Sequence, residues 1–94
     1  MASHAERATT LLKALSNPHR LMVLCLLVEG ERSVGELLES VSLSQSALSQ
    51  HLATLRRDQL VKTRREAQTI FYSLAEPRAA RVVALLHDMY CRNE

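Results

Sequence analysis

Several residue types are scarce or absent in this sequence. It has no tryptophan, two glycines, two prolines and two cysteines in 94 residues. It contains no Gly-rich phosphate-binding loop and no convincing set of nucleophile, base and acid. Its ten carboxylates fall mostly on predicted surfaces. We therefore expect a protein that is not an enzyme.

Long hydrophobic runs are also missing. The longest uninterrupted apolar segment is residues 21–28, eight residues, whereas a membrane-spanning helix needs about 20. The N-terminal sequence lacks the pattern of a signal peptide. We therefore expect no membrane partner and a cytoplasmic location. Thiols are normally kept reduced there, so a permanent disulfide between Cys25 and Cys91 is not expected, while a transient redox role stays open.

The composition is that of a folded protein, with 47% hydrophobic and 23% charged residues. A chain of this length has room for one domain, residues 1–94, with a modest core. Small folds of this kind often bury more apolar surface by pairing with a second copy. We therefore expect a single domain that forms a dimer.

The charge is distributed unevenly, although the net charge is only +2. Residues 29–39 carry four glutamates against one arginine, and residues 56–65 carry five Lys or Arg residues against one aspartate. The second stretch is a candidate phosphate-facing surface. Charge alone favours the alternative, a solvated charged face.

Two helices are predicted in the N-terminal third. Apolar residues recur at helical spacing in residues 5–15. Asn17 and Pro18 then predict the start of a second helix, because Asn can cap its N–H groups and Pro suits the first helical position. Residues 21–28 are apolar on all sides, so this helix is expected at the centre of the core, with Gly30 at its end.

Two further helices follow, separated by a short link. Ser33 and Glu36 have the spacing of a capping box, which predicts a third helix that ends near residue 40. After the link of residues 41–43, Ser44 can cap a fourth helix that ends near residue 58. The apolar positions of this fourth helix form one stripe and leave a polar face exposed. That stripe consists of Leu48, Leu52 and Leu55.

From residue 60 the period of the apolar pattern changes towards two, as is typical of β-strands. Residues 60–65 and 68–74 are β-type runs joined around Glu66 and Ala67, which predicts a hairpin. A type I turn would accommodate Ala67 at its tip. Residues 77–90 form a final helix with a broad apolar face. The predicted fold is mainly α-helical with a small β-hairpin.

Two short helices followed by a basic hairpin form a winged helix-turn-helix, here over residues 33–74. Such a fold places its second helix in the major groove of double-stranded DNA and its hairpin against the backbone. Small polar side chains let the helix approach the bases, and cations neutralise phosphates. The candidate DNA-binding residues are Ser44, Gln45, Ser46, Ser49, Gln50, His51, Arg56, Arg64, Arg65 and Gln68, with Arg57 and Lys62 as further phosphate-neutralising cations.

Several of these segments resemble the signature of the ArsR/SmtB repressor family. They are residues 44–52, Leu55-Arg56, Leu60-Val61 and residues 71–74. The resemblance implies a homodimer that pairs through residues 5–15 and 77–90 and binds an operator. Two positions depart from the family pattern, because Gln59 and Ala67 stand where the family often has glycine.

No metal site is expected. Metal-sensing relatives carry paired cysteines in the helix before recognition or paired ligands along the last helix, and neither pattern is present. In the last helix His87 and Asp88 are adjacent and so point in different directions. His4, His19 and His51 are isolated in the sequence, and each is better interpreted as a surface or helix-packing residue.

The residues around the two cysteines and in the hairpin resemble one subgroup of the family. It comprises the biofilm growth-associated repressor, the sulfide-responsive repressor and the hemolysin regulator. In that subgroup two cysteines at the positions of Cys25 and Cys91 become linked by reactive sulfur species or oxidants. The resemblance implies a repressor whose DNA is released by this thiol switch.

Three alternatives stay open at this stage. Cys25 is otherwise a small buried hydrophobic residue and Cys91 an incidental one. The protein could also be an activator that displaces another silencer from DNA without a thiol switch. A third alternative is a winged-helix module that binds proteins.

Overall fold

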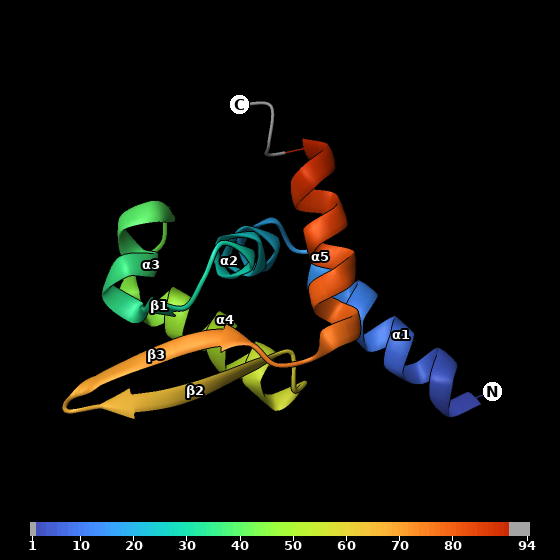
Figure 1. Ribbon diagram of the computed structural model, residues 1–94, viewed down its shortest axis with the longest axis horizontal. Helices are drawn as coiled ribbons and strands as arrows, with labels where there is room; N and C mark the ends of the chain where they lie inside the picture. The colour runs from blue at the N-terminus through green and yellow to red at the C-terminus, as the bar shows by residue number, and fades with distance from the viewer. Residues whose placement is uncertain (1, 91–94) are drawn as a thin grey trace.

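The computed structural model describes residues 2–90, which form five helices and a small sheet (Figure 1). The expected class, mainly α-helical with a small hairpin, is confirmed. In chain order the elements are α1 (Ala2–Leu15), α2 (Pro18–Val28), β1 (Arg32–Ser33), α3 (Val34–Ser40), α4 (Gln45–Arg57), β2 (Val61–Glu66), β3 (Thr69–Leu74) and α5 (Pro77–Tyr90).

The junction between α1 and α2 is held by polar side chains of one short segment. The Oδ1 atom of Asn17 accepts hydrogen bonds from the N–H groups of His19 and Arg20 at 2.9 and 3.1 Å. Arg20 in turn donates to the carbonyls of Ala14 and Lys13, at 3.3 and 3.2 Å, and so satisfies the end of α1. The predicted cap of the second helix is confirmed.

The caps predicted for α3 and α4 are also present. The Oγ atom of Ser33 accepts from the N–H of Glu36 at 3.1 Å, and the Glu36 carboxylate accepts from the Ser33 N–H at 2.9 Å. The hydrogen bond from the Ser33 N–H to the carboxylate lowers the pKa of Glu36, and the nearby Ser33 hydroxyl adds to the effect. Ser44 accepts from the N–H of Ala47 at 3.1 Å. Both helices therefore begin where the sequence predicts.

The core is organised around α2, which Figure 1 shows end-on between α5 and α3. Helix α2 packs against both α5 and α4. The buried residues of these three helices are Val23, Leu24, Cys25 and Leu27 in α2, Leu48, Leu52 and Leu55 in α4, and Ala79 and Val83 in α5. This single core fixes α4 relative to the rest of the chain.

The sheet has three strands in the order β1-β3-β2, all antiparallel. The sequence predicts the β2–β3 hairpin but not β1, which pairs Arg32 with Tyr72 and Ser33 with Phe71. Because β1 is only two residues long, it has no periodic pattern that a sequence could reveal. Its effect is to tie the start of α3 to the hairpin.

The tip of the hairpin differs from the expected turn. Glu66 pairs with Thr69, so the loop has only two residues, and Ala67 has a φ of 56°. A type I turn has no residue with positive φ, so that expectation is wrong. Two-residue hairpin loops favour primed turns because their twist matches that of the strands. Positive φ at Ala67 but not at Gln68 is the pattern of a type II′ turn.

Gln59 also adopts a left-handed conformation, with a φ of 62°. It follows α4, where its N–H donates to the carbonyl of Arg56 at 3.0 Å and the N–H of Leu60 donates to that of Leu55 at 2.9 Å. These are the two bonds of a Schellman motif, which places its left-handed residue directly after the helix cap. Both positions where the family often has glycine therefore require positive φ.

No single helix among residues 2–90 is long and apolar enough to cross a membrane. The helical segments Ser3–Leu15 and Pro18–Val28 reach the length and apolar composition of a membrane span only when taken together, and the chain bends by 99° between them.

Candidate nucleic-acid interface

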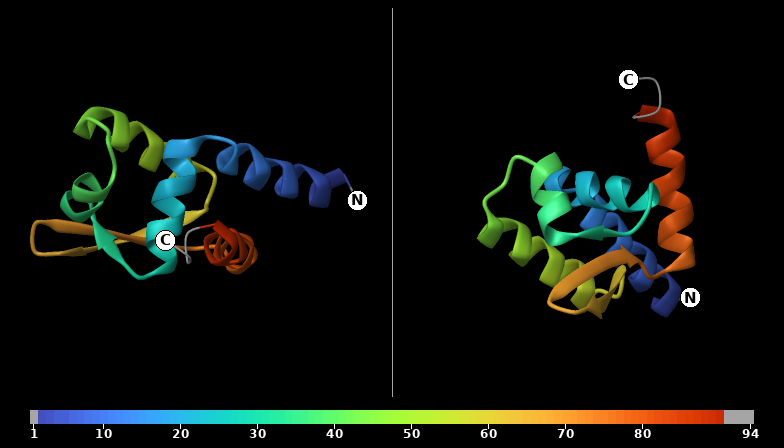
Figure 2. Two further views of the ribbon diagram at one scale, coloured as in Figure 1. Left: turned by 90° about the horizontal axis from the view of Figure 1, so that it is seen from above. Right: turned by 60° about the vertical axis from the view of Figure 1, so that its left-hand side comes forward.

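Helix α4 lies at the periphery of the molecule (Figure 2), and its polar side chains are exposed. The side chains of Leu48, Leu52 and Leu55 are no more than 1% exposed and pack α4 into the core. The predicted base-reading residues are all exposed: Ser44, Gln45, Ser46, Ser49 and Gln50. This amphipathic arrangement presents amide and hydroxyl groups that can pair with base edges and phosphates.

Ser44 has a structural role besides any contact with DNA. Its Oγ atom caps α4 through the N–H of Ala47 and lies 3.3 Å from the Oγ atom of Ser46. A capping oxygen that already accepts a backbone hydrogen bond helps to fix the start of the helix. Gln45, Ser49 and Gln50 make no side-chain hydrogen bond within residues 2–90, so their polar groups are available to a ligand.

His51 faces a different direction from the base-reading residues. Its ring is half-buried and lies 5.9 Å from the ring of His19 between centroids, with 31° between the planes. Burial lowers the pKa of His51, and the nearby Arg20 and His19 add to the effect. His19 and His51 are isolated in the sequence, and the packing of α2 against α4 brings their rings together.

The cations at the end of α4 are both exposed. Arg57 forms an ion pair with Asp58 at 3.3 Å, whereas Arg56 forms no ion pair with any described residue. Positive charge near a helix C-terminus also interacts favourably with the helix dipole. Arg56 is thus the cation of this pair that is available for a phosphate.

Arg64 is engaged by three neighbouring side chains of the protein itself. It donates to both carboxylate oxygens of Glu31, with distances of 2.8 to 3.0 Å, and to Glu66 at 3.0 Å. Its guanidinium carbon lies 4.6 Å from the centroid of the Phe71 ring. The hydrogen bonds to the two carboxylates raise the pKa of Arg64.

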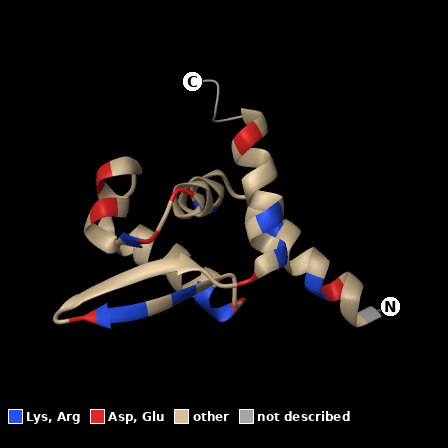
Figure 3. Ribbon diagram, in the orientation of Figure 1, with Lys and Arg blue, Asp and Glu red and all other residues tan. Residues whose placement is uncertain are grey.

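The other hairpin residues predicted to meet DNA carry no such partners. Lys62, Arg65 and Gln68 are exposed and make no side-chain hydrogen bond or ion pair with the rest of the described chain. Figure 3 shows the basic part of β2 bordered by the acidic Glu66 at the tip of the hairpin. The structure thus separates Arg64 from Arg65, which the sequence places side by side.

Cys25 lies in α2 with 5% of its surface exposed. The helix that carries it packs extensively against α5. Cys91 lies outside the described residues, immediately after α5 ends at Tyr90. The structure therefore places one of the two predicted switch residues, in the core and on the helix that packs against α5.

His87 is one of the residues that connect α5 to the rest of the fold. Its Nε2 atom lies 3.1 Å from Glu29, and Glu29 also pairs with Arg32 at 3.3 Å. Within residues 2–90 no three His, Cys, Asp or Glu side chains are grouped as metal ligands would be. Sequence reasoning missed this contact, because residues 58 positions apart in the chain meet only in the fold.

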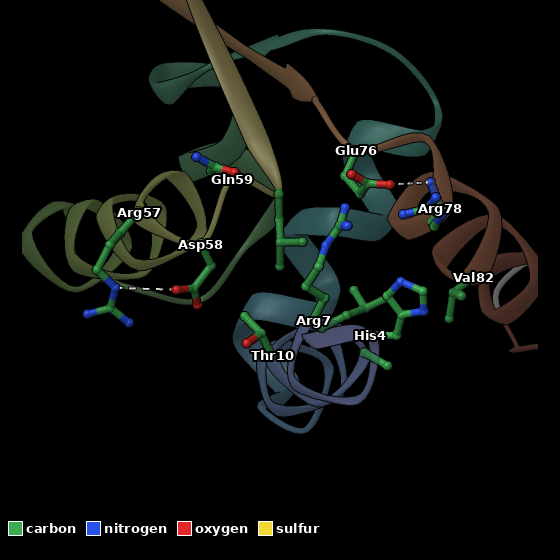
Figure 4. A pocket seen from close by; sticks show the side chains of 12 residues that line it. His4, Arg7, Thr10, Arg57, Asp58, Gln59, Glu76, Arg78 and Val82 are labelled. Atoms are coloured by element: carbon green, nitrogen blue, oxygen red, sulfur yellow. Dashed lines mark hydrogen bonds and ion pairs between the residues drawn. The ribbon is translucent and has the colours of Figure 1, made fainter. Parts of the chain in front are cut away.

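The helices α1 and α5 form a flank that leaves large apolar side chains in solvent. The exposed members are Leu12 on α1 and Val82, Leu85, Met89 and Tyr90 on α5, with 37 to 68% of their surface accessible. Next to them a groove of about 660 Å³ opens between α1, the end of α4 and the start of α5 (Figure 4). Arg7 extends from α1 into this groove, opposite Arg78.

Comparison with known proteins gives consistent matches along the chain. A family model described as "Bacterial regulatory protein, arsR family" matches residues 17–63. The chain is 53% identical over 92 residues to the transcriptional activator HlyU of Vibrio cholerae, covering 98% of this chain and 85% of that protein. It is 47% identical over 94 residues to the biofilm growth-associated repressor of Xylella fastidiosa, covering 100% of this chain and 82% of that one.

Solved structures of the same two relatives have the same fold. The structure of reduced HlyU from Vibrio cholerae superposes with a TM-score of 0.92, covering 98% of this chain and 97% of that chain. The structure of the repressor BigR from Xylella fastidiosa gives a TM-score of 0.86 at 47% identity, covering 97% and 93%. The arrangement of α4, the hairpin and α5 is therefore shared with two regulators.

Proposed function

Because the chain belongs to the ArsR family of bacterial regulatory proteins, we propose that it is a cytoplasmic, dimeric repressor that binds operator DNA and releases it when Cys25 and Cys91 become linked. Its relatives are DNA-binding transcriptional regulators and not enzymes. They also confirm the resemblance to the subgroup of the biofilm growth-associated repressor.

The observation that carries the DNA-binding proposal is the amphipathic geometry of α4. A helix whose apolar side is fully buried and whose polar side is exposed can enter a major groove without losing its own packing. Gln45 and Gln50 can pair with adenine edges, and Ser46 and Ser49 can serve bases or phosphates. Arg56 and the hairpin supply the electrostatic part of the affinity.

The exposed apolar flank supports a homodimer. Leu85 and Met89 lie one helical turn apart on α5, and each leaves more than half of its surface in solvent. A second copy that covers this flank would bury those side chains by a two-fold symmetric contact. Dimerisation would also present two copies of α4 to half-sites about one DNA turn apart.

The proposal of a thiol switch is supported by the position of Cys25 in α2, the helix that packs against α5. A persulfide transfers its outer sulfur to one thiolate, which forms a cysteine persulfide and releases the carrier as a thiol. The second cysteine then attacks the inner sulfur, forms the disulfide and releases sulfide. The two thiols are oxidised by two electrons, and the persulfide is reduced to a thiol and sulfide. A bond from Cys25 to Cys91 would tie α5 to the core and change the angle between the two copies of α4.

Two relatives support different versions of this function. Similarity to the repressor from Xylella fastidiosa favours a repressor role. HlyU, the relative with 53% identity, is a transcriptional activator, and similarity to it favours activation. A second candidate is therefore an activator that binds DNA without an obligatory thiol switch. One of the solved HlyU structures is described as the reduced protein, which favours a cysteine-dependent version of either role.

The test compares operator affinity before and after treatment with a persulfide. A duplex is first enriched from a random library on the reduced protein, and its affinity is then measured for wild type and for Cys25→Ser/Cys91→Ser. We expect wild type to lose at least about tenfold in affinity, about 1.4 kcal/mol, and to regain it with a reductant. The double variant is expected to keep its affinity. Release of DNA by the double variant would refute the switch, and failure to enrich any sequence would favour a protein-binding module.

The dimer is tested separately by sedimentation. Leu85→Gln/Met89→Gln removes two exposed apolar side chains from the flank, and we expect it to shift the protein from dimer to monomer. The matched control is Ala84→Gln, an exposed residue of the same helix outside that apolar pair. Equal association of all three proteins would refute pairing through α5.

A further inference from the structure

The guanidinium of Arg64 has more partners within the protein than any other hairpin cation. Its Nε and one terminal nitrogen donate to the Glu31 carboxylate at 2.8 to 3.0 Å, and its other terminal nitrogen donates to Glu66 at 3.0 Å. Its face lies over the ring of Phe71. All three nitrogens and one face of the side chain are therefore already in use.

The local charge around Arg64 is negative despite its own charge. Two carboxylates, Glu31 and Glu66, surround one guanidinium, so the three side chains together carry a net charge of −1. A phosphate that approached this point would meet two like charges and compete with a two-point carboxylate contact. These surroundings therefore disfavour a phosphate contact at Arg64.

Arg65 is in the opposite situation. Successive side chains of a strand point to opposite faces, so Arg64 and Arg65 lie on different faces of the hairpin. Arg65 is exposed, and in the described part of the chain it has no carboxylate partner. Of the two neighbouring arginines, only Arg65 presents an uncompensated charge.

The partner that engages Arg64 comes from a distant part of the chain. Glu31 directly precedes β1, which in turn leads into α3 and the helix-turn-helix. The Glu31 to Arg64 contact therefore joins the hairpin to the start of the DNA-reading unit, across 33 positions of sequence. A two-point Arg–carboxylate contact fixes orientation as well as distance.

We infer that Glu31 is a positioning residue that holds the hairpin against the helix-turn-helix and withdraws Arg64 from DNA, so that Arg65 makes the hairpin's phosphate contact. This inference rests on the proposed DNA binding and adds a division of labour between two adjacent arginines. Glu66 and Phe71 complete the cluster that holds Arg64.

The salt dependence of DNA affinity tests this inference, because its slope counts phosphate contacts. The probe is a duplex of about 30 base pairs of mixed sequence, with affinity measured by fluorescence anisotropy between about 50 and 300 mM salt. Each phosphate contact contributes about 0.9 to the magnitude of the slope. Arg65→Gln is expected to lower that magnitude by about 0.9, and Arg64→Gln to leave it unchanged.

Glu31→Gln is the decisive variant, since it removes the negative charge and keeps the shape of the side chain. We expect it to free Arg64 for a phosphate and raise the slope magnitude by up to about 0.9. The matched control is Glu6→Gln on α1, which makes the same charge change at the opposite end of the molecule from the hairpin (Figure 1). A purely structural role of Glu31 would weaken binding without raising the slope.

The outcomes distinguish failure of the Glu31 inference from failure of the proposed DNA binding. If Arg64→Gln lowers the slope as much as Arg65→Gln, or if Glu31→Gln behaves like Glu6→Gln, the inference is overturned while DNA binding stands. If the wild-type protein shows no salt-dependent binding of the duplex, the proposed function fails and the inference fails with it. A melting curve for each variant verifies that the fold is retained.

Discussion

Apolar side chains are buried in the DNA-reading part of this molecule and exposed on the α1–α5 flank. Beneath the polar face of α4, Leu52 is 1% exposed and Leu48 is fully buried. On α5, Leu85 is 59% exposed and Met89 is 53% exposed. The first region completes its core within one chain, whereas the second leaves apolar surface uncovered. Residues that stabilise the chain itself are therefore distinct from those that the proposed dimer would bury.

The largest expected effect on stability comes from a substitution in the core beneath the DNA-reading helix. Leu52→Ala leaves a cavity below α4 and is expected to reduce the free energy of unfolding by about 2–5 kcal/mol. Leu85→Ala on the flank is the matched control, and it should change the stability of the monomer by no more than about 0.5 kcal/mol. Urea denaturation at low protein concentration measures both values. Equal losses would remove the distinction between the two regions.

A smaller effect is expected at the cap of α3, where the reading part begins. Ser33→Ala removes the side-chain oxygen that accepts the Glu36 N–H and should cost about 1 kcal/mol in unfolding free energy. The control is Ser42→Ala, in the link between α3 and α4, where the exposed serine makes no side-chain hydrogen bond with any described residue. If both substitutions cost the same, the capping box contributes nothing to the stability of this region.

Local patterns predicted most of the fold. Helix starts at Asn17, Ser33 and Ser44 follow from side chains that cap the first N–H groups, and each cap is present. The period-two pattern correctly gave β2 and β3. These features depend on residues close together in the chain, which is why a sequence can reveal them.

Features that depend on distant contacts could not be predicted. Glu31 and Arg64 look like unrelated surface charges until the fold places them 2.8 Å apart. His19 and His51 likewise meet only because α2 packs against α4. Of the candidate site, the exposed face of α4 follows from its pattern, whereas the division between Arg64 and Arg65 follows only from tertiary structure.

A gain in stability is expected at the tip of the hairpin. Ala67 has a φ of 56°, which costs an L-residue about 1–2 kcal/mol, and glycine avoids this cost while losing about 0.5–1 kcal/mol through backbone entropy. Ala67→Gly should therefore raise the free energy of unfolding by about 0.5 kcal/mol. Ala53→Gly in the exposed part of α4 is the matched control and should lower it by about 1 kcal/mol. A loss at both positions would show that the turn stores no strain.

The smallest effect concerns the contact between α2 and α4 and appears only as pH is changed. Burial lowers the pKa of His51 below 6.5, with further contributions from Arg20 and His19. Below about pH 6.5 the unfolded chain therefore binds more protons at this position than the folded one. Stability should decrease as the pH falls through 6.5 and should stop decreasing from this source below the folded pKa.

His51→Gln removes the titrating group, so the urea midpoint should change less between about pH 7.5 and about pH 5.5 than that of wild type. His4→Gln, in the exposed part of α1, makes the same substitution away from the α2–α4 contact and serves as the control for other titrating groups. A variant at His51 that retains the full pH dependence of wild type would assign that dependence elsewhere. The stability of the reading part would then not depend on the protonation of His51. The electrostatic part of its stability would come from its carboxylate and arginine contacts.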